Sequence, residues 1–395
     1  MKTGESTQLQ RVIGYFHGTI FLFSIIIGAG IFIAPKGVLK YTSLNVGVSL
    51  IIWAACAIVS MIAALSYAEL GTTFPISGAQ FYFLKRSLGS IIAFFYLWIS
   101  LFSTPAGLAA RGLLLAGYIL QPFFPGCFVP EMPKKCLALA ILWCLGILNA
   151  RGVKEVAWFQ TITTLVKMAV LCFISVTGIV LLIRGRKENV ARFENAFDAE
   201  VPDALQIAEA FLQGLYAYSG WGVLVQIAGE LKNPSENINK CVVTALTLVA
   251  VIYLLVNISY IAVLTPKEIM SSDLILLINY VGFINWLELG LMMIGLLKLR
   301  YQEPNLHRPY RVRLPLVFGT MAMSFFLVLT PTIKSPTMSH IYAFLFIFSG
   351  LLFYLPFGHF NLNCTYFNKI TCFLQLLLNV SPADDINDYI SEEGR

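Results

Sequence analysis

Long apolar stretches alternate with short polar segments along almost the whole chain. The pattern predicts about ten membrane spans, near residues 16–39, 44–68, 90–118, 136–150, 158–183, 205–229, 241–264, 274–297, 314–333 and 340–360. Most of these stretches have the length that an α-helix needs to cross the hydrocarbon core of a bilayer. Because a chain in lipid must satisfy its own backbone hydrogen bonds, we expect an all-α multi-pass membrane protein with about ten transmembrane helices.

Glycine interrupts two of the predicted spans. The first span contains Ile27-Gly28-Ala29-Gly30, and the sixth contains Tyr218-Ser219-Gly220-Trp221. Unwinding a helix within the bilayer is costly unless the freed backbone groups meet a ligand, water or protein. Two breaks at corresponding places in a many-helix chain therefore indicate a solute site near the bilayer midplane. The alternative is that the glycines only let neighbouring helices approach closely.

Composition and charge support the membrane interpretation and give an orientation. The chain is 58% hydrophobic and 12% charged, with a mean hydropathy of +0.77, far from the balance of a soluble domain. An even number of spans puts both termini on one side. Short loops with Lys85-Arg86, with Arg151 and Lys154, and with the basic residues of 298–313 all fall on the N-terminal side, which predicts cytoplasmic termini. The polar residues 1–11 predict no cleavable signal.

Lys167 and Glu288 are two ionisable residues within predicted spans. Lys167 either stands buried near mid-membrane or extends to the inner interface. Glu288 pairs with a cation, is protonated, or faces a water-filled cavity. No His–carboxylate cluster, nucleophile pair or metal-ligand pattern accompanies them, so the sequence predicts neither an enzyme nor a metal or cofactor site.

Two segments that contain proline and glycine hold further candidate functional residues. Cys127 lies in a proline-rich loop on the predicted outer side, where disulfides persist, and it either bridges to another chain or pairs with Cys136. The segment 67–82 contains proline and glycine near the predicted inner face, and it is either a re-entrant segment or an ordinary loop.

Several motifs together resemble one known family. They are Gly28-Ala-Gly-Ile-Phe32, Tyr67-Ala-Glu-Leu-Gly-Thr72, Tyr218-Ser-Gly-Trp221 and Gly229-Glu-Leu-Lys-Asn-Pro234. In combination they resemble the light chains of heteromeric amino-acid transporters, solute carrier family 7, in the amino acid–polyamine–organocation group with the LeuT-type inverted-repeat fold. The run Tyr301-Gln-Glu-Pro-Asn305 is similar to that of a sodium-independent aspartate/glutamate transporter in this family.

The resemblance implies a domain organisation with a missing part. It implies a transmembrane domain over residues 1–360, with a first repeat at about 16–183, an incomplete second repeat at about 205–297 and two further helices at 314–360. Residues 361–395 would form a cytoplasmic tail. Helices 8 and 9 of the family have no counterpart at Asp273–Leu274. Two interpretations follow: a plasma-membrane exchanger of aspartate, glutamate or related amino acids, or a shortened form that binds its partner without transporting.

The resemblance also implies roles for named residues. The backbone N–H groups of Ala29 and Gly30 would hold the substrate carboxylate, because a half-helix N-terminus suits an anion. The carbonyls of Ile26, Tyr216 and Ser219 would hold the substrate ammonium, with the Tyr216 ring as a gate.

Four more residues take implied roles outside this backbone clamp. Thr104 stands where many relatives carry arginine, and Arg111, seven residues on, returns to nearly the same helix face. Either could contact the substrate side chain. Lys167 would replace the sodium ion of sodium-coupled relatives, and Cys127 would bridge to a single-span type II glycoprotein heavy chain.

Overall fold

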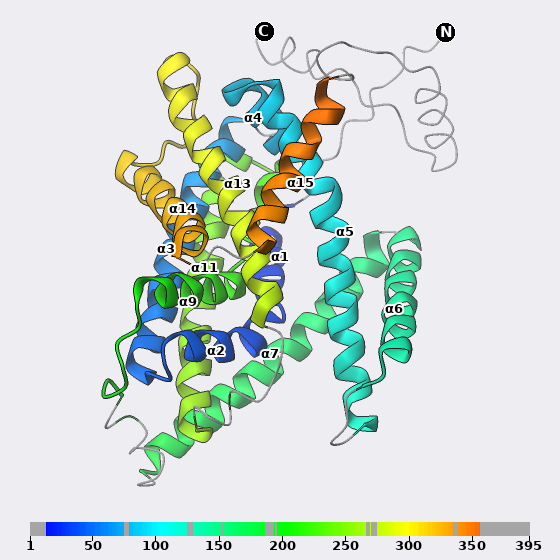
Figure 1. Ribbon diagram of the computed structural model, residues 1–395, viewed down its shortest axis with the longest axis vertical. Coiled ribbons are helices and arrows are strands. Elements are labelled where there is room, and N and C mark those ends of the chain that lie inside the picture. Colours follow the sequence, from blue (N-terminus) through cyan, green and yellow to red (C-terminus); the bar gives the residue numbers. More distant parts are fainter. Residues whose placement is uncertain are drawn as a thin grey trace. The chain divides into compact units, whose positions relative to one another are not determined.

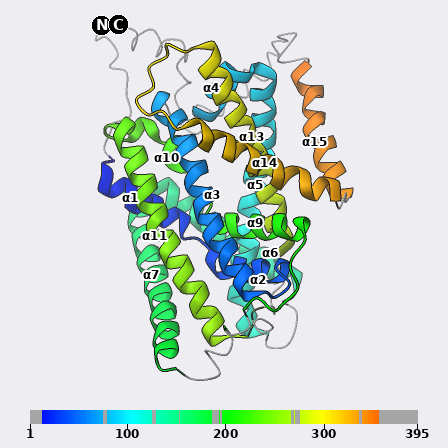
Figure 2. The same ribbon diagram turned by 90° about the vertical axis from the view of Figure 1, so that its left-hand side faces the viewer.

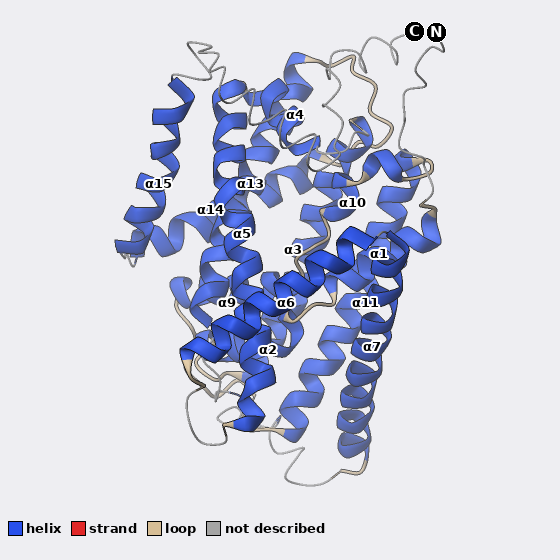
Figure 3. Cartoon of the chain, turned by 90° about the vertical axis from the view of Figure 1, so that its right-hand side faces the viewer, coloured by secondary structure: helices blue, strands red, loops and turns tan. Residues whose placement is uncertain are grey.

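The chain is helical throughout the part that the structure describes. The computed structural model describes residues 13–74, 79–124, 129–151, 153–185, 196–265, 275–334 and 338–355, together with Phe193 and Ile269. These residues form helices and loops (Figure 3). The extended pairing found among them is an isolated parallel bridge between Ile13 and Leu231.

The helices are short at the glycine breaks and long elsewhere (Figure 1). They are α1 (Tyr15–Ile26), α2 (Gly30–Tyr41), α3 (Val46–Thr73), α4 (Ala79–Leu88), α5 (Ser90–Leu120), α6 (Glu131–Arg151), α7 (Val153–Ile183), α9 (Ala204–Ala217), α10 (Val223–Gln226), α11 (Pro234–Val263), α13 (Ile275–Gln302), α14 (Leu314–Lys334) and α15 (Met338–Tyr354). Among the described residues, those up to Ala343 belong to one compact unit and those from Phe344 onward to a second. The site described below lies within the first unit.

The described residues support a multi-pass membrane protein with fewer clear spans than the predicted ten. Six helices are long and apolar enough to cross a bilayer, or seven when the bent α1–α2 pair is counted as one span. The predicted span 205–229 is split, because α9 ends at Ala217 and α10 is only four residues long. α6 is not among the six, and neither is α15, which has only 17 residues. The proposed gap at Asp273 lies outside the described residues.

The segment 67–82 is mostly helical rather than a loop. α3 continues to Thr73, five residues beyond the predicted end of its span. α4 begins at Ala79, and the residues between 75 and 78 lie outside the described part. Gly71, within α3, packs against the Val225 side chain, where an added Cβ would lie 2.7 Å from Cγ1.

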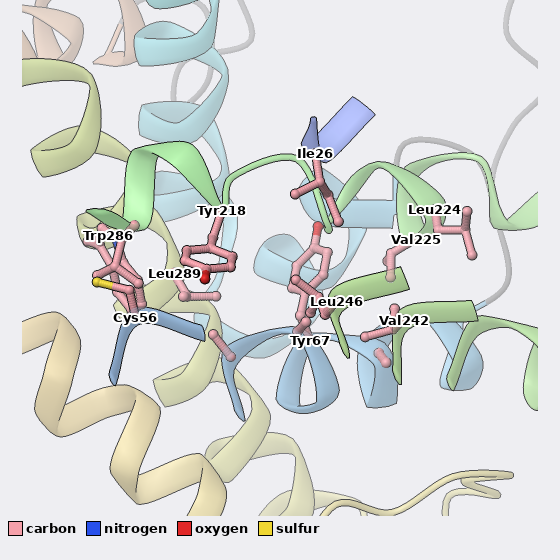
Figure 4. Close-up of a cluster of buried hydrophobic side chains, with 14 of the residues drawn as sticks. Ile26, Cys56, Tyr67, Tyr218, Leu224, Val225, Val242, Leu246, Trp286 and Leu289 are labelled. Atoms are coloured by element: carbon pink, nitrogen blue, oxygen red, sulfur yellow. The ribbon is translucent and has the colours of Figure 1, made fainter. Parts of the chain in front are cut away.

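The core is built around α3 and α11. α11 packs along α3 and α7 and against α1, and α2 packs along α9 (Figure 2). Trp53 of α3 and Tyr253 of α11 are completely buried, with their rings in a T-shaped contact at 6.0 Å. Tyr218, beside the second break, lies 5.0 Å from the Tyr253 ring, and it belongs to the buried cluster of Figure 4. The core therefore includes the sequence around the second break.

The outer faces of several helices carry large apolar side chains. Leu101 on α5, Trp143 on α6, and Trp158 and Phe173 on α7 are between 64% and 73% exposed. Such faces suit contact with lipid, because a bilayer does not penalise exposed apolar surface as water does.

Candidate functional site

Both predicted helix breaks are present. α1 ends at Ile26 and α2 begins at Gly30, and the two helices meet at an angle of 48°. α9 ends at Ala217 and α10 begins at Val223. Gly220 has a φ of +103°, a conformation that residues with a side chain rarely adopt, so glycine is required at the second break.

The two breaks contact each other directly. A Cβ added at Gly30 would lie 2.6 Å from the Cα of Ala217, closer than real contacts allow. A Cβ added at Gly220 would lie 2.8 Å from the Cγ2 of Ile25. The glycines therefore let the backbones of the two breaks touch, as the close-approach interpretation of the glycines predicts.

Tyr253 joins the two breaks by hydrogen bonding. Its hydroxyl lies 3.0 Å from the Ile26 carbonyl oxygen and 3.1 Å from the Ala217 carbonyl oxygen, and it can donate to either. These are the last residues of α1 and α9, whose carbonyls the breaks leave without a helical partner. Sequence reasoning missed Tyr253. The signal in the sequence was a tyrosine within a predicted span, which also contains Tyr260.

Lys167 holds the first break from α7. Its Nζ donates to the carbonyl oxygens of Ser24 and Ile27, at 3.1 and 2.6 Å. The Ser24 hydroxyl is 2.6 Å from that of Thr164 and accepts from Gln160 Nε2 at 3.3 Å. Gln160, Thr164 and Lys167 share one face of α7 because they are four and three residues apart. The ammonium is therefore directed at the break and not at a distant interface.

The N-terminus of α2 has no side-chain cap. Ala29 is its N-cap residue and is exposed, and no side chain accepts from the first amides of α2. Those amides lack acceptors within the helix, as in any helix N-terminus. At the second break, the Tyr216 carbonyl accepts from the Ser219 amide at 3.2 Å. The first break therefore offers backbone N–H donors. The second offers backbone carbonyl acceptors, some of which already accept a hydrogen bond within the break.

A cavity of about 320 Å³ lies beside the second break. This volume is within the usual range of small-molecule sites. Its lining comes from α3, α4, α5, α9, α10 and α13 and from the break itself, and consists of Ser60, Tyr67, Gln80, Tyr96, Ser100, Ser103, Thr104, Leu215, Tyr216, Ser219, Gly220, Trp221, Gly222, Val223, Gln226, Gly282, Asn285, Trp286, Glu288, Leu289 and Met292. Hydroxyl, amide and aromatic groups therefore dominate the lining.

The cavity includes part of the expected substrate site. Tyr216, Ser219 and Thr104 are in the lining, whereas Ile26, Ala29 and Gly30 are not. At Gly30 the backbone lies directly against Ala217. The role of Ile26, Ala29 and Gly30 in substrate binding therefore stays a prediction.

Arg111 does not reach the cavity. It is exposed on α5 and absent from the lining, because two helical turns separate it from Thr104. Glu288 is in the lining and half-buried, so its side chain faces the cavity. Tyr67 and Trp221, in edge-to-face contact at 5.7 Å, form another part of the wall that sequence reasoning missed.

A second polar cluster surrounds the fully buried carboxylate of Glu69. Arg300 donates to both carboxylate oxygens, Arg308 Nε lies 3.8 Å from Oε1, and the Val312 amide donates to Oε2 at 2.8 Å. The two arginine side chains are only 7% and 6% exposed. This cluster ties the end of α3 to the end of α13 and to the segment after it.

A neighbouring ion pair joins α4 to the end of α13. Arg86 donates to Glu303 through Nε and Nη2, at 3.0 and 2.6 Å. This bidentate contact raises the pKa of Arg86, and partial burial opposes it. Glu303 belongs to the motif 301–305 that the sequence singled out, so this motif has a structural role.

Cys127 lies outside the described residues. Cys136, the alternative intramolecular partner, is an exposed free thiol on α6. Within the described ranges, no cluster of three His, Cys, Asp or Glu side chains could hold a metal ion.

Broken helices that meet beside a polar cavity define a membrane solute-transport protein, and comparison with known proteins gives the family. Residues 13–282 match the amino acid permease family, so the chain belongs to it. Within it, the chain is an amino-acid transporter of solute carrier family 7 and not an enzyme. It is 45% identical to solute carrier family 7 member 13 of Mus musculus and 46% identical to that of Homo sapiens, each covered over 100% of both chains. It is 30% identical to the human b(0,+)-type amino acid transporter 1, over 96% of this chain and 95% of that one.

The alignment with the mouse relative also measures what this chain lacks. It runs over 476 positions and includes the whole of both chains, so about 81 positions have no residue from the 395 of this chain. Because both chains are covered from end to end, these positions lie inside the aligned region. About 81 residues is the length of two membrane helices with their loops.

Proposed function

We propose that this chain is the light chain of a sodium-independent amino-acid exchanger that binds its substrate in the cavity beside the second break. The observation that carries the proposal is the contact of the two breaks next to a polar cavity lined by Tyr216 and Ser219. A site on backbone groups suits a transporter of several amino acids, because every α-amino acid has the same carboxylate and ammonium.

In this proposal, the contact between Gly30 and Ala217 indicates that the conformation precedes the step of the transport cycle in which the two breaks separate. The uncapped amides of α2 would reach a substrate carboxylate only after the two breaks separate. Alternating access moves one bundle of helices against another around a fixed site, and such a motion would separate them. Tyr216, half-buried in the lining, would close over the bound substrate.

Lys167 supports independence from sodium. Its ammonium bonds two carbonyls of the first break, so a fixed positive charge stands where a bound cation would otherwise neutralise them. Uptake should therefore be equal when choline replaces sodium in the external solution. Uptake that requires sodium would contradict this role.

Aspartate and glutamate are the substrates that the resemblance implies. The described lining does not add a basis for this preference, since it contains no Lys or Arg and has Thr104 where many relatives have arginine. The acidic preference therefore rests on the resemblance alone.

The proposed partner is a single-span type II glycoprotein, linked through Cys127 in the plasma membrane, with both termini of this chain cytoplasmic. Replacement of Cys127 by serine should remove a disulfide-linked band on a non-reducing gel. Replacement of Cys136, an exposed free thiol nine residues on, should leave that band in place. A band that survives loss of Cys127 would show that the assignment is wrong.

A second candidate function is association without transport. The 81 alignment positions without a residue in this chain favour it, because helices 8 and 9 belong to the scaffold of this fold. Uptake of radiolabelled amino acids into proteoliposomes that contain the chain with its heavy chain separates the two candidates. Uptake above empty vesicles supports the exchanger, whereas no uptake from an intact linked complex supports the shortened, non-transporting form.

A further inference from the structure

Glu288 is the one carboxylate among the described residues of the cavity lining. It lies on α13, on the face that also presents Asn285 and Met292 to the cavity. These residues are three and four positions apart, the spacing that repeats along one face of a helix. The side chain is half-buried, so it is open to the cavity and not enclosed in the core.

No described cation neutralises this carboxylate. The ion pairs of the described residues do not include Glu288, and no Lys, Arg or His is in the described lining. The two nearest candidates named by the sequence are elsewhere. Lys167 is bonded to carbonyls of the first break, and Arg111 is exposed outside the cavity.

The other polar groups near Glu288 are hydroxyls and amides. Tyr67, Tyr96, Gln80 and Ser100 share the lining, and the Tyr96 hydroxyl donates to Gln80 Oε1. These neutral groups can accept or donate for many ligands, and they do not offset a charge. In its ionised form, the carboxylate therefore sets the sign of the potential that a substrate side chain meets in this cavity.

We propose that Glu288 is a specificity-determining residue, which makes the cavity favour amino acids with a cationic side chain or a neutral side chain that donates hydrogen bonds over those with an anionic side chain. The proposal rests on the proposed function, because it requires that the substrate side chain enters this cavity. An ionised carboxylate accepts N–H and O–H donors in charge-assisted hydrogen bonds. It repels a second carboxylate strongly where water is scarce.

The test measures binding, so it does not depend on completed transport. Purified full-length chain, with its disulfide-linked partner where one co-purifies, is titrated with radiolabelled L-lysine, L-glutamine and L-aspartate. Wild type should bind lysine or glutamine more tightly than aspartate. Glu288→Gln should lower the ratio of lysine to aspartate affinity by about tenfold or more, because it removes the charge and keeps the shape.

Two further variants make the result specific. Glu288→Asp keeps the charge and should keep the order of affinities. Glu236→Gln removes an exposed carboxylate of α11 that pairs with Lys240 outside the cavity, and it should leave all three affinities unchanged. If wild type and Glu288→Gln both show saturable binding with the same ratio of lysine affinity to aspartate affinity, the proposed role of Glu288 is wrong, and the proposed site still stands. No saturable binding of any of the three amino acids to wild type would overturn the proposed site together with it.

Discussion

Replacement of Tyr253 by phenylalanine should loosen the junction of the two breaks. The change removes one oxygen and keeps the ring, so the contacts with Trp53 and Tyr218 stay in place. The Ile26 and Ala217 carbonyls then lose the donor that they share. Tyr253 is completely buried, so water does not replace the hydroxyl without a rearrangement of the core.

The size of the effect follows from one hydrogen bond and from the buried Ala217 carbonyl, because the Ile26 carbonyl still accepts from the Gly28 amide at 2.8 Å. A typical hydrogen bond contributes about 0.5–1.5 kcal/mol net, and a buried polar group left unsatisfied costs about 1–3 kcal/mol. One hydroxyl proton serves one carbonyl at a time, so these terms do not double. We expect a destabilisation of about 1.5–3 kcal/mol, which corresponds to a fall of roughly 2–6 °C in the apparent melting temperature.

The assay compares two variants with the same chemical change on the same helix. Tyr260 lies seven residues after Tyr253 on α11, is half-buried, and makes no hydrogen bond through its hydroxyl among the described residues. Heating detergent-solubilised protein, followed by size-exclusion chromatography, gives an apparent melting temperature for each. Tyr260→Phe should stay within about 0.5 kcal/mol of wild type. Equal melting temperatures for the two variants would refute the bridging role of Tyr253.

Three other changes test the remaining contacts of the site. Lys167→Met should lower amino-acid affinity about tenfold or more and destabilise the first break, because two carbonyls lose charge-assisted hydrogen bonds of about 1.5–3 kcal/mol each. Unchanged affinity and an unchanged melting temperature would show that Lys167 does not stabilise the first break. Gly30→Ala should lower the stability of the protein by about 1–3 kcal/mol, because the new Cβ meets the Cα of Ala217. Gly107→Ala is the control: an added Cβ there meets nothing, so the melting temperature in the same heating assay should not change. Glu69→Gln should destabilise the protein by about 3–5 kcal/mol, because it leaves two buried guanidinium groups without their anion; full yield of monodisperse protein with wild-type stability would contradict this.

The sequence predicts the breaks well because their cause is local. Gly28, Gly30 and Gly220 interrupt apolar runs, and a helix loses stability wherever glycine removes the side chain. The structure places the end of α1, the start of α2 and the end of α9 beside these residues. Membrane character also follows from local composition, which is why family, class and helical fold agree with the prediction.

Contacts between distant helices were not predictable in the same way. Hydropathy does not indicate that the tyrosine at 253, rather than that at 260, meets the two breaks, because this depends on how α11 is rotated against α1 and α9. Arg111 is a second example. Thr104 lines the cavity and Arg111 does not, which the spacing of seven residues between them did not indicate. Arg300 and Arg308 counted as loop charges in the orientation argument, yet both are buried against Glu69.

The contacts that hold the two breaks survive the loss of the segment that the relatives contain. Lys167 reaches the first break from α7, and Tyr253 reaches both breaks from α11, so one support comes from each expected repeat. Both helices lie before the expected gap at residue 273, and neither contact needs an additional helix. In the proposed function, recognition of an amino acid depends on these breaks and on the cavity beside them, whereas alternating access also needs a scaffold for the moving bundle. Binding and transport are therefore separable in this chain, and a binding measurement tests the site even if uptake proves absent.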